Sequence, residues 1–367
     1  MAPSIRTAFH EATAGRGGTH VDEGGWFWCA GFGDPAGEYS AVRDDVAVWD
    51  VSPLNKWEFR GRDALRAAQY LFSNDFLGTA SGQARYGAFL DADGLVVDDG
   101  TVYNLGRDDR CWVMTNGRDR EDYFASLLGA FDVEWEWKTQ QMPNLGIVGP
   151  RSRDLVRSLT DADVDALKYF RFFPEPVTVG GVEVILSRTG FGGELGFELF
   201  LTDPADATEL YATVVGAGAR PFGVTVIEPL RVEAGLIVTG YDYAEHERTP
   251  YDLGLDRLVA LGSDVDFAGK SRLAGVASAP PNRFVTLRID GETLPAYGAE
   301  VRAGGAVVGV LTSPADSPRL GLLGMAIVRT EHASLGARVA VELPDGETTA
   351  TVDALPIYDH DKRRPRA

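Results

Sequence analysis

The part of the chain after residue 282 constrains the fold more than any other. It follows a short Pro-rich segment, Ser278–Asn282, and divides into short runs of alternating apolar and polar residues separated by Gly, Pro or Asp turns. This spacing is typical of strands in a small β-barrel or sandwich. We expect six strands, at Phe284–Ile289, Ala299–Arg302, Ala306–Leu311, Gly324–Ile327, Arg338–Leu343 and Thr348–Ala354.

The region before this segment mixes helices and strands. Amphipathic patterns predict helices, and apolar runs between them predict strands, without the regular alternation of a doubly wound sheet. We therefore expect an α+β region over residues 1–277 and a C-terminal β-barrel domain over residues 283–367. The expected helices are Arg62–Ser73, Arg118–Phe131 and Ala205–Gly216, and the expected strands are Cys111–Met114, Val133–Trp137, Leu145–Val148 and Val182–Leu186.

Two adjacent carboxylates, Asp98 and Asp99, end an apolar run within Gly82–Tyr103. Leu95–Val97 predicts a short strand behind an Asp-Gly turn, and Thr101–Leu105 resumes extended structure. Because side chains alternate across a strand, we expect one carboxylate to face solvent and the other the opposite face. A buried carboxylate is costly unless it is hydrogen-bonded, so one of the two is a candidate ligand-binding group. The alternative is a solvated turn with a capping Asp.

Composition excludes several classes of protein. The 367 residues are 44% hydrophobic, which supports a sizeable core, and the formal net charge of −19 argues against nucleic-acid binding. No apolar run is long enough to span a membrane, and no apolar leader is evident, so we expect a cytoplasmic protein. Cys29 and Cys111 are expected to be reduced, packed thiols. The five histidines are scattered and predict no metal site.

A glycine-rich stretch, Thr189–Phe197, follows a predicted strand but does not fit a dinucleotide fingerprint. Its glycine spacing is wrong, and the residues after it predict a strand rather than the helix that would hold a pyrophosphate. We interpret these glycines as shaping a tight hairpin that lets the backbone approach a ligand.

Five separated stretches occur in one order along the first 270 residues: VWDVSPLNKWEFRGRDAL (48–65), GQARYGAFLDADGLVVDDGTVY (82–103), SRTGFGGELGFELFL (187–201), LRVEAGLIVTGYDY (230–243) with TPYDLGLDRLV (249–259), and FAGK (267–270). Their order resembles the aminomethyltransferase family of the glycine cleavage T-protein and its folate-dependent demethylase relatives. The C-terminal stretch GVLTSPADSPRLGLLGMAIV (309–328) is similar to the barrel segment of that family. The resemblance therefore covers nearly the whole chain.

The resemblance implies a three-lobed α+β protein whose final lobe is a β-barrel and whose centre binds tetrahydrofolate. By its position in the motif, Asp99 corresponds to the acid beside the pterin ring, and Tyr86 to a folate-contacting Tyr. Glu198 matches the residue that hydrogen-bonds the amino-pyrimidine edge, and Asn116 matches an Asn near the same pocket.

These residue types also suit a reduced pterin chemically. A carboxylate such as Glu198 accepts two adjacent N–H donors, and an aromatic ring such as Tyr86 or Phe191 packs on a pterin face. A fixed carboxylate at Asp99 would stabilise positive charge on a ring nitrogen that accepts carbon. The alternative for Glu198 is a solvent-facing strand residue, since apolar residues flank it.

Departures from the glycine cleavage enzymes favour the demethylase branch. Those enzymes carry Ala-Arg-Asp before the central helix and His-Met after the Asp-Val-Ser motif, whereas this chain has Val226–Pro229 and Pro53-Leu54. The expected donor is a small methylated metabolite bearing an O-, S- or N-methyl group. Trp28, in a glycine-flanked aromatic loop, and Tyr241 are candidates for contacting it, because aromatic faces attract methylated cations. The alternative is that the loop packs as core.

The leading hypothesis is thus a tetrahydrofolate-dependent demethylase or methyltransferase acting on a small-molecule methyl donor. One alternative is a glycine cleavage T-protein, which would require a lipoyl carrier protein as partner. A second alternative is a non-enzymatic folate-binding protein of iron–sulfur assembly. This chain has no Lys-Gly-Cys segment of that kind after the central helix, which disfavours it. The sequence does not identify the donor or the oligomeric state.

Overall fold

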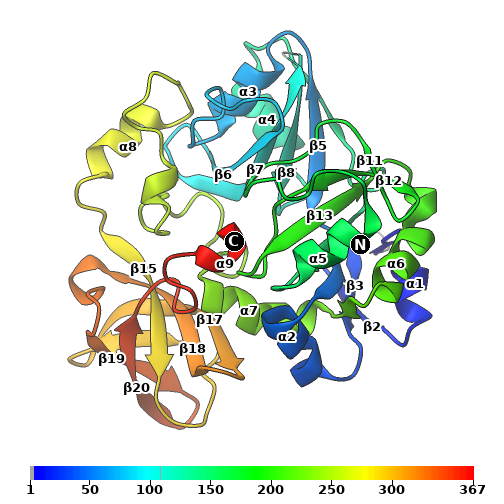
Figure 1. The fold of residues 1–367 in the computed structure, drawn as a ribbon. Coiled ribbons are helices and arrows are strands. Elements are labelled where there is room, and N and C mark those ends of the chain that lie inside the picture. Colours follow the sequence, from blue (N-terminus) through cyan, green and yellow to red (C-terminus); the bar gives the residue numbers. More distant parts are fainter. Residues whose placement is uncertain (1–3, 108) are drawn as a thin grey trace.

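The computed structural model describes residues 4–107 and 109–367, which form three lobes. In Figure 1 a five-stranded sheet lies at the top, a six-stranded sheet at the right and a closed barrel at the lower left. The predicted α+β class with a C-terminal barrel is confirmed. A small three-stranded sheet completes the described β-structure, with strand order β1 (Ile5–Arg6), β3 (Trp26–Gly31) and β2 (Thr19–Glu23).

The barrel contains six strands, as the turn spacing predicts. Two of them are longer than expected, because a β-bulge after Leu311 lets their pairing continue to Ser317. Apolar side chains fill the barrel interior. The order around the barrel is β15 (Asn282–Ile289), β18 (Gly321–Arg329), β17 (Ala306–Ser317), β16 (Glu300–Ala303), β19 (Arg338–Leu343) and β20 (Gly346–Asp353).

After β20 the chain leaves the barrel and packs on the six-stranded lobe. Its short terminal helix, α9 (Arg363–Arg366), lies near the centre of the view in Figure 1. Arg188 donates a hydrogen bond to the Pro365 carbonyl at 3.0 Å, which ties the tail to that lobe. The expected division into residues 1–277 and 283–367 stays a prediction.

The five-stranded sheet has helices on one face. Helices α3 (Ala64–Leu71) and α4 (Glu121–Leu128) are the cores of two predicted helices, and their apolar faces cover an aromatic-rich cluster on the sheet. The two strands expected on either side of the Asp pair form one strand, because pairing with both neighbours continues past Asp98 and Asp99. The strand order is β6 (Gln83–Leu90), β7 (Val96–Arg107), β8 (Arg110–Thr115), β5 (Asn55–Arg60) and β9 (Glu134–Trp137).

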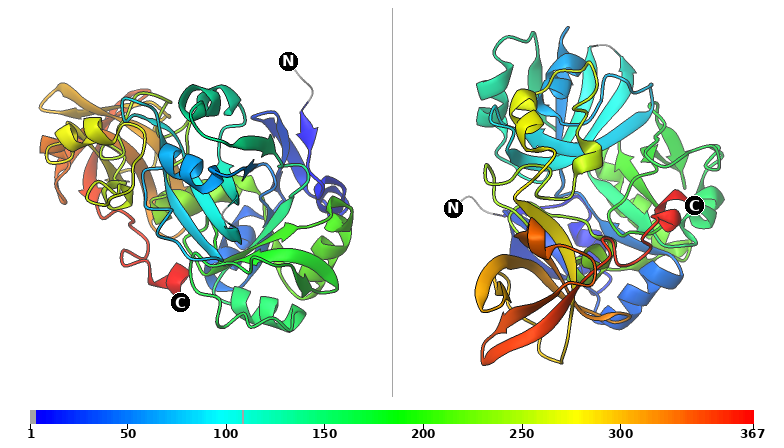
Figure 2. Two further views of the ribbon diagram at one scale, coloured as in Figure 1. Left: turned by 90° about the horizontal axis from the view of Figure 1, so that it is seen from above. Right: turned by 90° about the vertical axis from the view of Figure 1, so that its left-hand side faces the viewer.

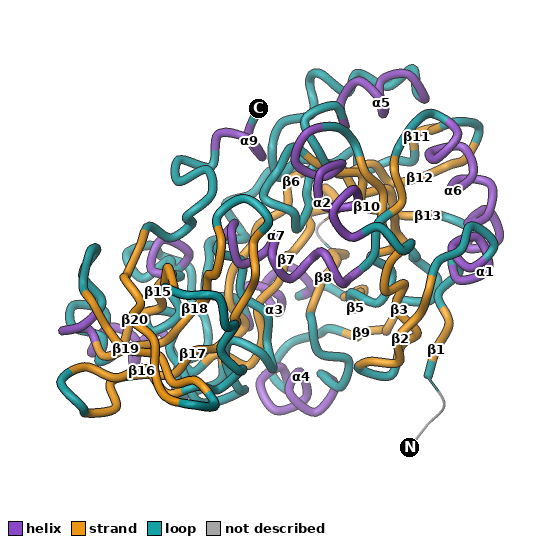
Figure 3. The backbone as a smooth tube through the Cα atoms, turned by 90° about the horizontal axis from the view of Figure 1, so that it is seen from below, coloured by secondary structure: helices purple, strands orange, loops and turns teal. Residues whose placement is uncertain are grey.

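The six-stranded sheet interleaves with the five-stranded sheet along the chain. Strand β4 (Ala47–Asp50) precedes β5, and β9 precedes β10 (Asn144–Val148), so the chain crosses twice between the two sheets. Figure 3 shows from below that the two sheets lie next to each other. The strand order is β11 (Val177–Val179), β12 (Val182–Ser187), β13 (Gly196–Leu201), β10 (Asn144–Val148), β4 (Ala47–Asp50) and β14 (Arg220–Pro221). The helices of this lobe are α1 (His10–Ala14), α2 (Pro35–Asp44), α5 (Ser152–Leu159), α6 (Ala207–Gly216) and α7 (Ile227–Ala234).

A long connection joins the sheets to the barrel and contains α8 (Lys270–Val276). The two views in Figure 2 show the barrel at one end of the molecule, with this connection beside the five-stranded sheet. None of the helices within residues 4–107 and 109–367 combines the length and apolar character that a membrane crossing requires. Cys29 and Cys111 are buried free thiols, as expected.

The helix-free face of the five-stranded sheet packs against the six-stranded sheet. Met114 on the first sheet shares an apolar cluster with Phe200 on the second. Cross-strand partners lie on one face of a sheet, so the row Tyr86–Thr101–Met114–Lys56 lies on this face. On the opposing sheet the row Ser187–Glu198–Gly146–Trp49 contains Glu198, two residues from Phe200 and therefore on the same face. The junction between the sheets thus brings polar side chains from both together.

Gly146 lets Trp49 lie close to the strand that carries Glu198. A Cβ at this position would lie 2.4 Å from the Trp49 Nε1 atom and 3.0 Å from Val51 Cγ2. We predict that Gly146→Ala lowers the free energy of unfolding by about 1–3 kcal/mol, because the junction must shift to relieve the overlap. Urea denaturation measures this change.

Gly216→Ala is the matched control, because no atom lies within 4 Å of a Cβ at this helical position. We expect it to leave stability unchanged or to raise it slightly. Equal stability of Gly146→Ala and Gly216→Ala would contradict the tight packing at Trp49.

Candidate active site

Asp98 and Asp99 lie in the middle of β7, and both are buried, with 0% and 4% of their surfaces exposed. The expectation that one of them faces solvent is wrong. The side chains do point to opposite faces of the sheet, but α4 covers one face and the barrel connection covers the other. The solvated-turn alternative is therefore excluded.

Asp98 points toward the start of α4 and has a structural role. Its Oδ2 accepts hydrogen bonds from the Arg120 Nε and the Gly117 backbone N–H, each at 2.9 Å. Its Oδ1 accepts the backbone N–H of Asp99 at 2.8 Å. A buried guanidinium thus compensates the charge of this carboxylate.

Asp99 is held differently, by hydroxyl groups. Tyr86 donates to its Oδ2 at 2.7 Å, and Tyr243 donates to its Oδ1 at 2.5 Å. Asn116 donates to the Asp99 carbonyl at 2.8 Å and more weakly to the Asp99 carboxylate at 3.3 Å. Among the residues that the structure describes, no cationic side chain forms an ion pair with Asp99. Three predicted site residues, Tyr86, Asp99 and Asn116, are therefore in direct contact.

The environment of Asp99 favours its neutral form. Burial is the main cause that raises the pKa of Asp99 to about 7, and the charge of Asp98 adds to it. The two tyrosine hydroxyls oppose the shift by donating to the carboxylate. A carboxyl group with a pKa near neutrality can both accept and release a proton under physiological conditions.

Tyr243 is a site residue that the sequence analysis missed. It lies two residues after the predicted Tyr241 in the stretch YDY, and strand alternation would place both rings on one face, so the spacing gave no signal that Tyr243 is the residue that meets Asp99. Between them, Asp242 is buried and accepts hydrogen bonds from Arg231 at 2.9 Å and from Thr312 at 2.6 Å. Because Thr312 belongs to β17, the barrel fixes the position of Tyr243 against Asp99.

Glu198 lies on β13 and is 7% exposed, so it is not the solvent-facing strand residue of the alternative interpretation. Asn144 donates to its Oε1 at 3.1 Å, and the Thr189 hydroxyl donates to its Oε2. Burial is the main cause that raises the pKa of Glu198. Thr189 also lies 3.2 Å from the hydroxyl of Tyr103, which is on β7 with Asp99. Glu198 is therefore linked through Thr189 to the strand that carries Asp99.

The remaining predicted site residues, Trp28, Phe191 and Tyr241, lie outside the hydrogen-bonded group around Asp99. Trp28 and Phe191 are half-buried and pack against one apolar cluster that contains Trp49. The adjacent Trp26 is 4% exposed, so this part of the aromatic loop is core. Tyr241 is 46% exposed and packs on the ring of Tyr297 at 5.7 Å. It does not contact the Asp99 carboxyl group.

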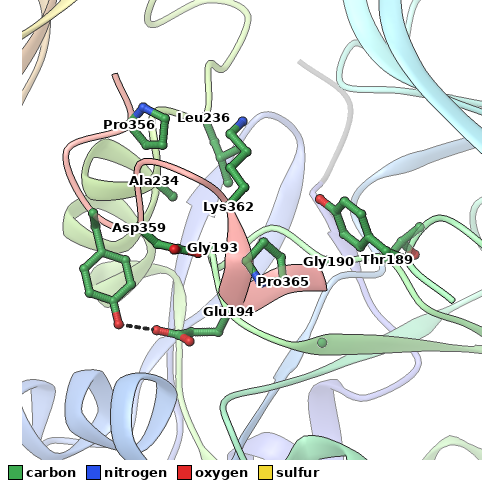
Figure 4. Close-up of a pocket in the computed structure, with 13 residues that line it drawn as sticks. Thr189, Gly190, Gly193, Glu194, Ala234, Leu236, Pro356, Asp359, Lys362 and Pro365 are labelled. Atoms are coloured by element: carbon green, nitrogen blue, oxygen red, sulfur yellow. Dashed lines mark hydrogen bonds between the residues drawn. The ribbon is translucent and has the colours of Figure 1, made fainter. Parts of the chain in front are cut away.

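A pocket opens next to Thr189, between the glycine-rich hairpin and the C-terminal tail (Figure 4). Thr189 and Gly190 line one side, and Lys362 and Pro365 of the tail line the other. Tyr358 and Glu194 also line this pocket, and the Tyr358 hydroxyl donates to Glu194 at 2.6 Å. Thr189 therefore contacts both this opening and Glu198. No group of three or more potential metal-ligating side chains was found among residues 4–107 and 109–367.

Comparison with known families accounts for almost the whole chain. The profile of the GCVT N-terminal domain matches residues 9–263, and that of the glycine cleavage T-protein C-terminal barrel domain matches residues 282–359. The chain belongs to the glycine cleavage T-protein family. Members of this family are folate-dependent one-carbon transferases.

Full-length relatives support this assignment. The aminomethyltransferase of Streptomyces avermitilis is 34% identical over 359 residues, which cover 94% of this chain and 95% of that protein. The trimethylamine-oxide aldolase of Ruegeria pomeroyi is 33% identical over 386 residues, which cover 99% of this chain but 48% of that protein. The structure of aminomethyltransferase T from Bartonella henselae has the same fold, with a TM-score of 0.87 at 21% identity over 97% of this chain and 98% of that chain.

The buried Asp99 carboxyl group makes stability depend on pH. Its pKa rises from an ordinary value of 3.8 to about 7 on folding, so the folded state holds a proton that the unfolded state releases between these pH values. This contribution to stability is present below pH 4 and is lost as the pH rises through 7. We predict that the wild type loses about 2–3 kcal/mol relative to Asp99→Asn between pH 5 and pH 8, measured by urea denaturation.

Asp98→Asn provides the contrast, because it removes the buried one of the two carboxylates that pair with the Arg120 guanidinium and leaves only the more exposed Glu245. It should be less stable than the wild type throughout this range. Parallel stability–pH curves for the wild type and Asp99→Asn would show that Asp99 keeps an ordinary pKa.

Proposed function

We propose that this protein transfers a one-carbon unit from a small donor to tetrahydrofolate, with Asp99 as the catalytic carboxyl group. The observation that carries the proposal is the position of Asp99, buried between the hydroxyls of Tyr86 and Tyr243 on the face that meets the second sheet. Family membership and the full-length relatives support folate as the acceptor.

The donor and acceptor atoms at the junction suit a reduced folate. The carboxylate of Glu198 can accept paired N–H groups of an aminopyrimidine edge. Asn144 beside it has a buried Oδ1 without a hydrogen-bond partner, which leaves an acceptor for a further N–H. When bound, a reduced folate supplies the nucleophilic nitrogen that accepts the carbon.

The residues around Asp99 can then assist at the reacting centre. An anionic Asp99 stabilises positive charge that develops next to it, and burial strengthens this interaction. With a pKa near 7, it can also take up the proton that the accepting nitrogen loses. Tyr86 and Tyr243 hold the carboxyl group in one orientation by donating to its two oxygens.

The first candidate donor is an aminomethyl group carried by a lipoyl protein, as in glycine cleavage. The full-length match to the aminomethyltransferase of Streptomyces avermitilis supports this reaction. A similar match, 30% identical over 99% of this chain, exists with the aminomethyltransferase of Listeria innocua. These relatives favour aminomethyl transfer over methyl transfer. The sequence motifs alone had placed aminomethyl transfer second.

The second candidate donor is a small methylated metabolite. It is supported by the match to the trimethylamine-oxide aldolase and by Pro53-Leu54, which replace the His-Met of the glycine cleavage enzymes. Leu54 packs against the cluster that contains Trp28 and against the apolar cluster at the junction, so this change lies close to the proposed site. The half-buried Trp28 and Phe191 provide aromatic surface there.

Product analysis separates these reactions. We predict one of two reactions. With an aminomethyl-lipoyl carrier protein, tetrahydrofolate is converted to methylene-tetrahydrofolate, with release of ammonia and the reduced lipoyl thiol. With a methylated amine, sulfonium or aryl ether, it is converted to 5-methyl-tetrahydrofolate, with release of the demethylated donor. Mass spectrometry identifies the product and therefore the donor. Folate binding without turnover of any donor would contradict the enzymatic proposal and favour a non-enzymatic folate-binding protein.

Asp99→Asn tests the catalytic assignment. We predict that it lowers kcat by about 10²–10⁴-fold, because the amide neither carries the charge nor accepts the proton. Asp93→Asn is the matched control, since Asp93 lies in an exposed turn of the same hairpin and should leave kcat unchanged. Equal kcat values for Asp99→Asn and Asp93→Asn would contradict the assignment of Asp99 as the catalytic carboxyl group.

A further inference from the structure

Lys56 is a fully buried lysine with few partners. Its side chain extends from β5 into the junction between the two sheets, where 0% of its surface is exposed. Its Nζ donates to the Ser52 carbonyl at 2.9 Å. Within the described residues no other hydrogen bond or ion pair of this ammonium group is found, although it has three donors. Arg120, by contrast, pairs with Asp98 and Glu245.

The charged groups that face Lys56 are two acids on strands of the opposing six-stranded sheet. Burial lowers the pKa of Lys56 to about 7, and the charges of Glu198 on β13 and Asp50 on β4 oppose this change. Asp50 is itself hydrogen-bonded to Thr7 and to the Ser52 backbone N–H. Neither acid forms an ion pair with Lys56 among the described residues.

Lys56, Ser52, Asn144 and Glu198 form one buried group of side chains, which we call the Lys56 cluster. The Asn144 backbone N–H donates to the Ser52 hydroxyl at 3.2 Å, and the Asn144 amide donates to Glu198. The Asn144 Oδ1 has no partner, although Asn144 is wholly buried. The cluster therefore holds unused donors on Lys56 and an unused acceptor on Asn144.

Unused hydrogen-bonding groups in a buried site are unfavourable unless a ligand or water meets them. Within the cluster, Lys56 lies on the face of the five-stranded sheet that also carries Tyr86 and Asp99, because one cross-strand row runs from Tyr86 to Lys56. Glu198 faces it from the opposing sheet. A polar ligand that reaches from Asp99 to Glu198 would therefore meet Lys56 at the Glu198 end.

The pattern of donors and acceptors indicates which ligand edge fits. Glu198 and the Asn144 Oδ1 accept N–H groups, while Lys56 donates. The matching edge carries an amino group and a ring N–H next to a carbonyl oxygen, which is the polar edge of a 2-amino-4-oxopyrimidine ring. An ammonium donor to a carbonyl oxygen is a charge-assisted hydrogen bond, stronger than a neutral one.

We propose that Lys56 is a folate-binding residue that donates a hydrogen bond to the 4-oxo group of the pterin, beside Glu198. This inference rests on the proposed function, since it assumes that a folate occupies the junction. The inference adds to the proposed site a residue, Lys56, that favours ligands with an oxo group over ligands with an amino group at position 4 of the pterin.

The test compares two ligands on two proteins. The ligands are folic acid and its 4-amino analogue, which replaces the oxo acceptor with an amino group, and the variant is Lys56→Met, which keeps the length of the side chain without its charge. We expect the variant to bind folic acid about tenfold more weakly or worse, and to bind the 4-amino analogue no more weakly than the wild type does. Isothermal titration calorimetry measures both affinities.

Proton uptake provides a readout that a purely structural role would not alter. Because a bound oxo group favours the charged amine, folic acid binding at pH 8 should take up protons through Lys56. Asp99 also titrates near pH 7, so Asp99→Asn is compared with Asp99→Asn/Lys56→Met in buffers of different ionisation enthalpy. We expect folic acid binding to take up protons in Asp99→Asn and to take up none in Asp99→Asn/Lys56→Met.

The outcomes distinguish the inference from the function on which it rests. If the wild type binds neither ligand, the proposed function fails. If the wild type binds folic acid and Lys56→Met loses equal affinity for both ligands, or none, the assignment of Lys56 is overturned while folate binding stands. Thermal unfolding of Lys56→Met verifies that it is folded, and replacement of a buried charge by an apolar side chain should not lower its stability.

Discussion

The burial of the Asp99 carboxyl group between two tyrosine hydroxyls is the interaction on which the site depends. An unpaired carboxylate is expensive to bury, and Asp99 lacks the guanidinium that compensates Asp98 one residue earlier. The hydroxyls of Tyr86 and Tyr243 satisfy its oxygens without neutralising its charge. The result is a carboxyl group poised to change protonation near pH 7, as acid–base catalysis requires.

The three lobes each contribute to this arrangement. The five-stranded sheet supplies Asp99 and Tyr86, and the six-stranded sheet supplies Glu198 across the junction. The barrel acts indirectly, since its Thr312 and Ser313 hydroxyls bind Asp242 and so position the neighbouring Tyr243. The proposed site therefore lies where the two sheets meet, and the barrel supports it through Tyr243.

Local pattern predicted the barrel well, because alternation and turn residues are encoded within each hairpin. The same reasoning correctly gave Asp98 and Asp99 opposite directions but failed on their burial. Burial depends on what packs over each face, and the partner Tyr243 is 144 residues from Asp99. Lys56 was missed for the same reason, since a lysine in a short strand ordinarily indicates an exposed position. The family resemblance, rather than periodicity, brought Tyr86, Asn116 and Glu198 together with Asp99.

The central claim is that Asp99 and Glu198 face one shared ligand across the junction of the two sheets. A crystal structure of the protein with a bound reduced folate tests it most directly. The account predicts the pyrimidine edge at Glu198 and the carbon-accepting nitrogen next to the Asp99 carboxyl group. A folate bound elsewhere, with Asp99 still enclosed by Tyr86 and Tyr243 and not in contact with it, would contradict the account.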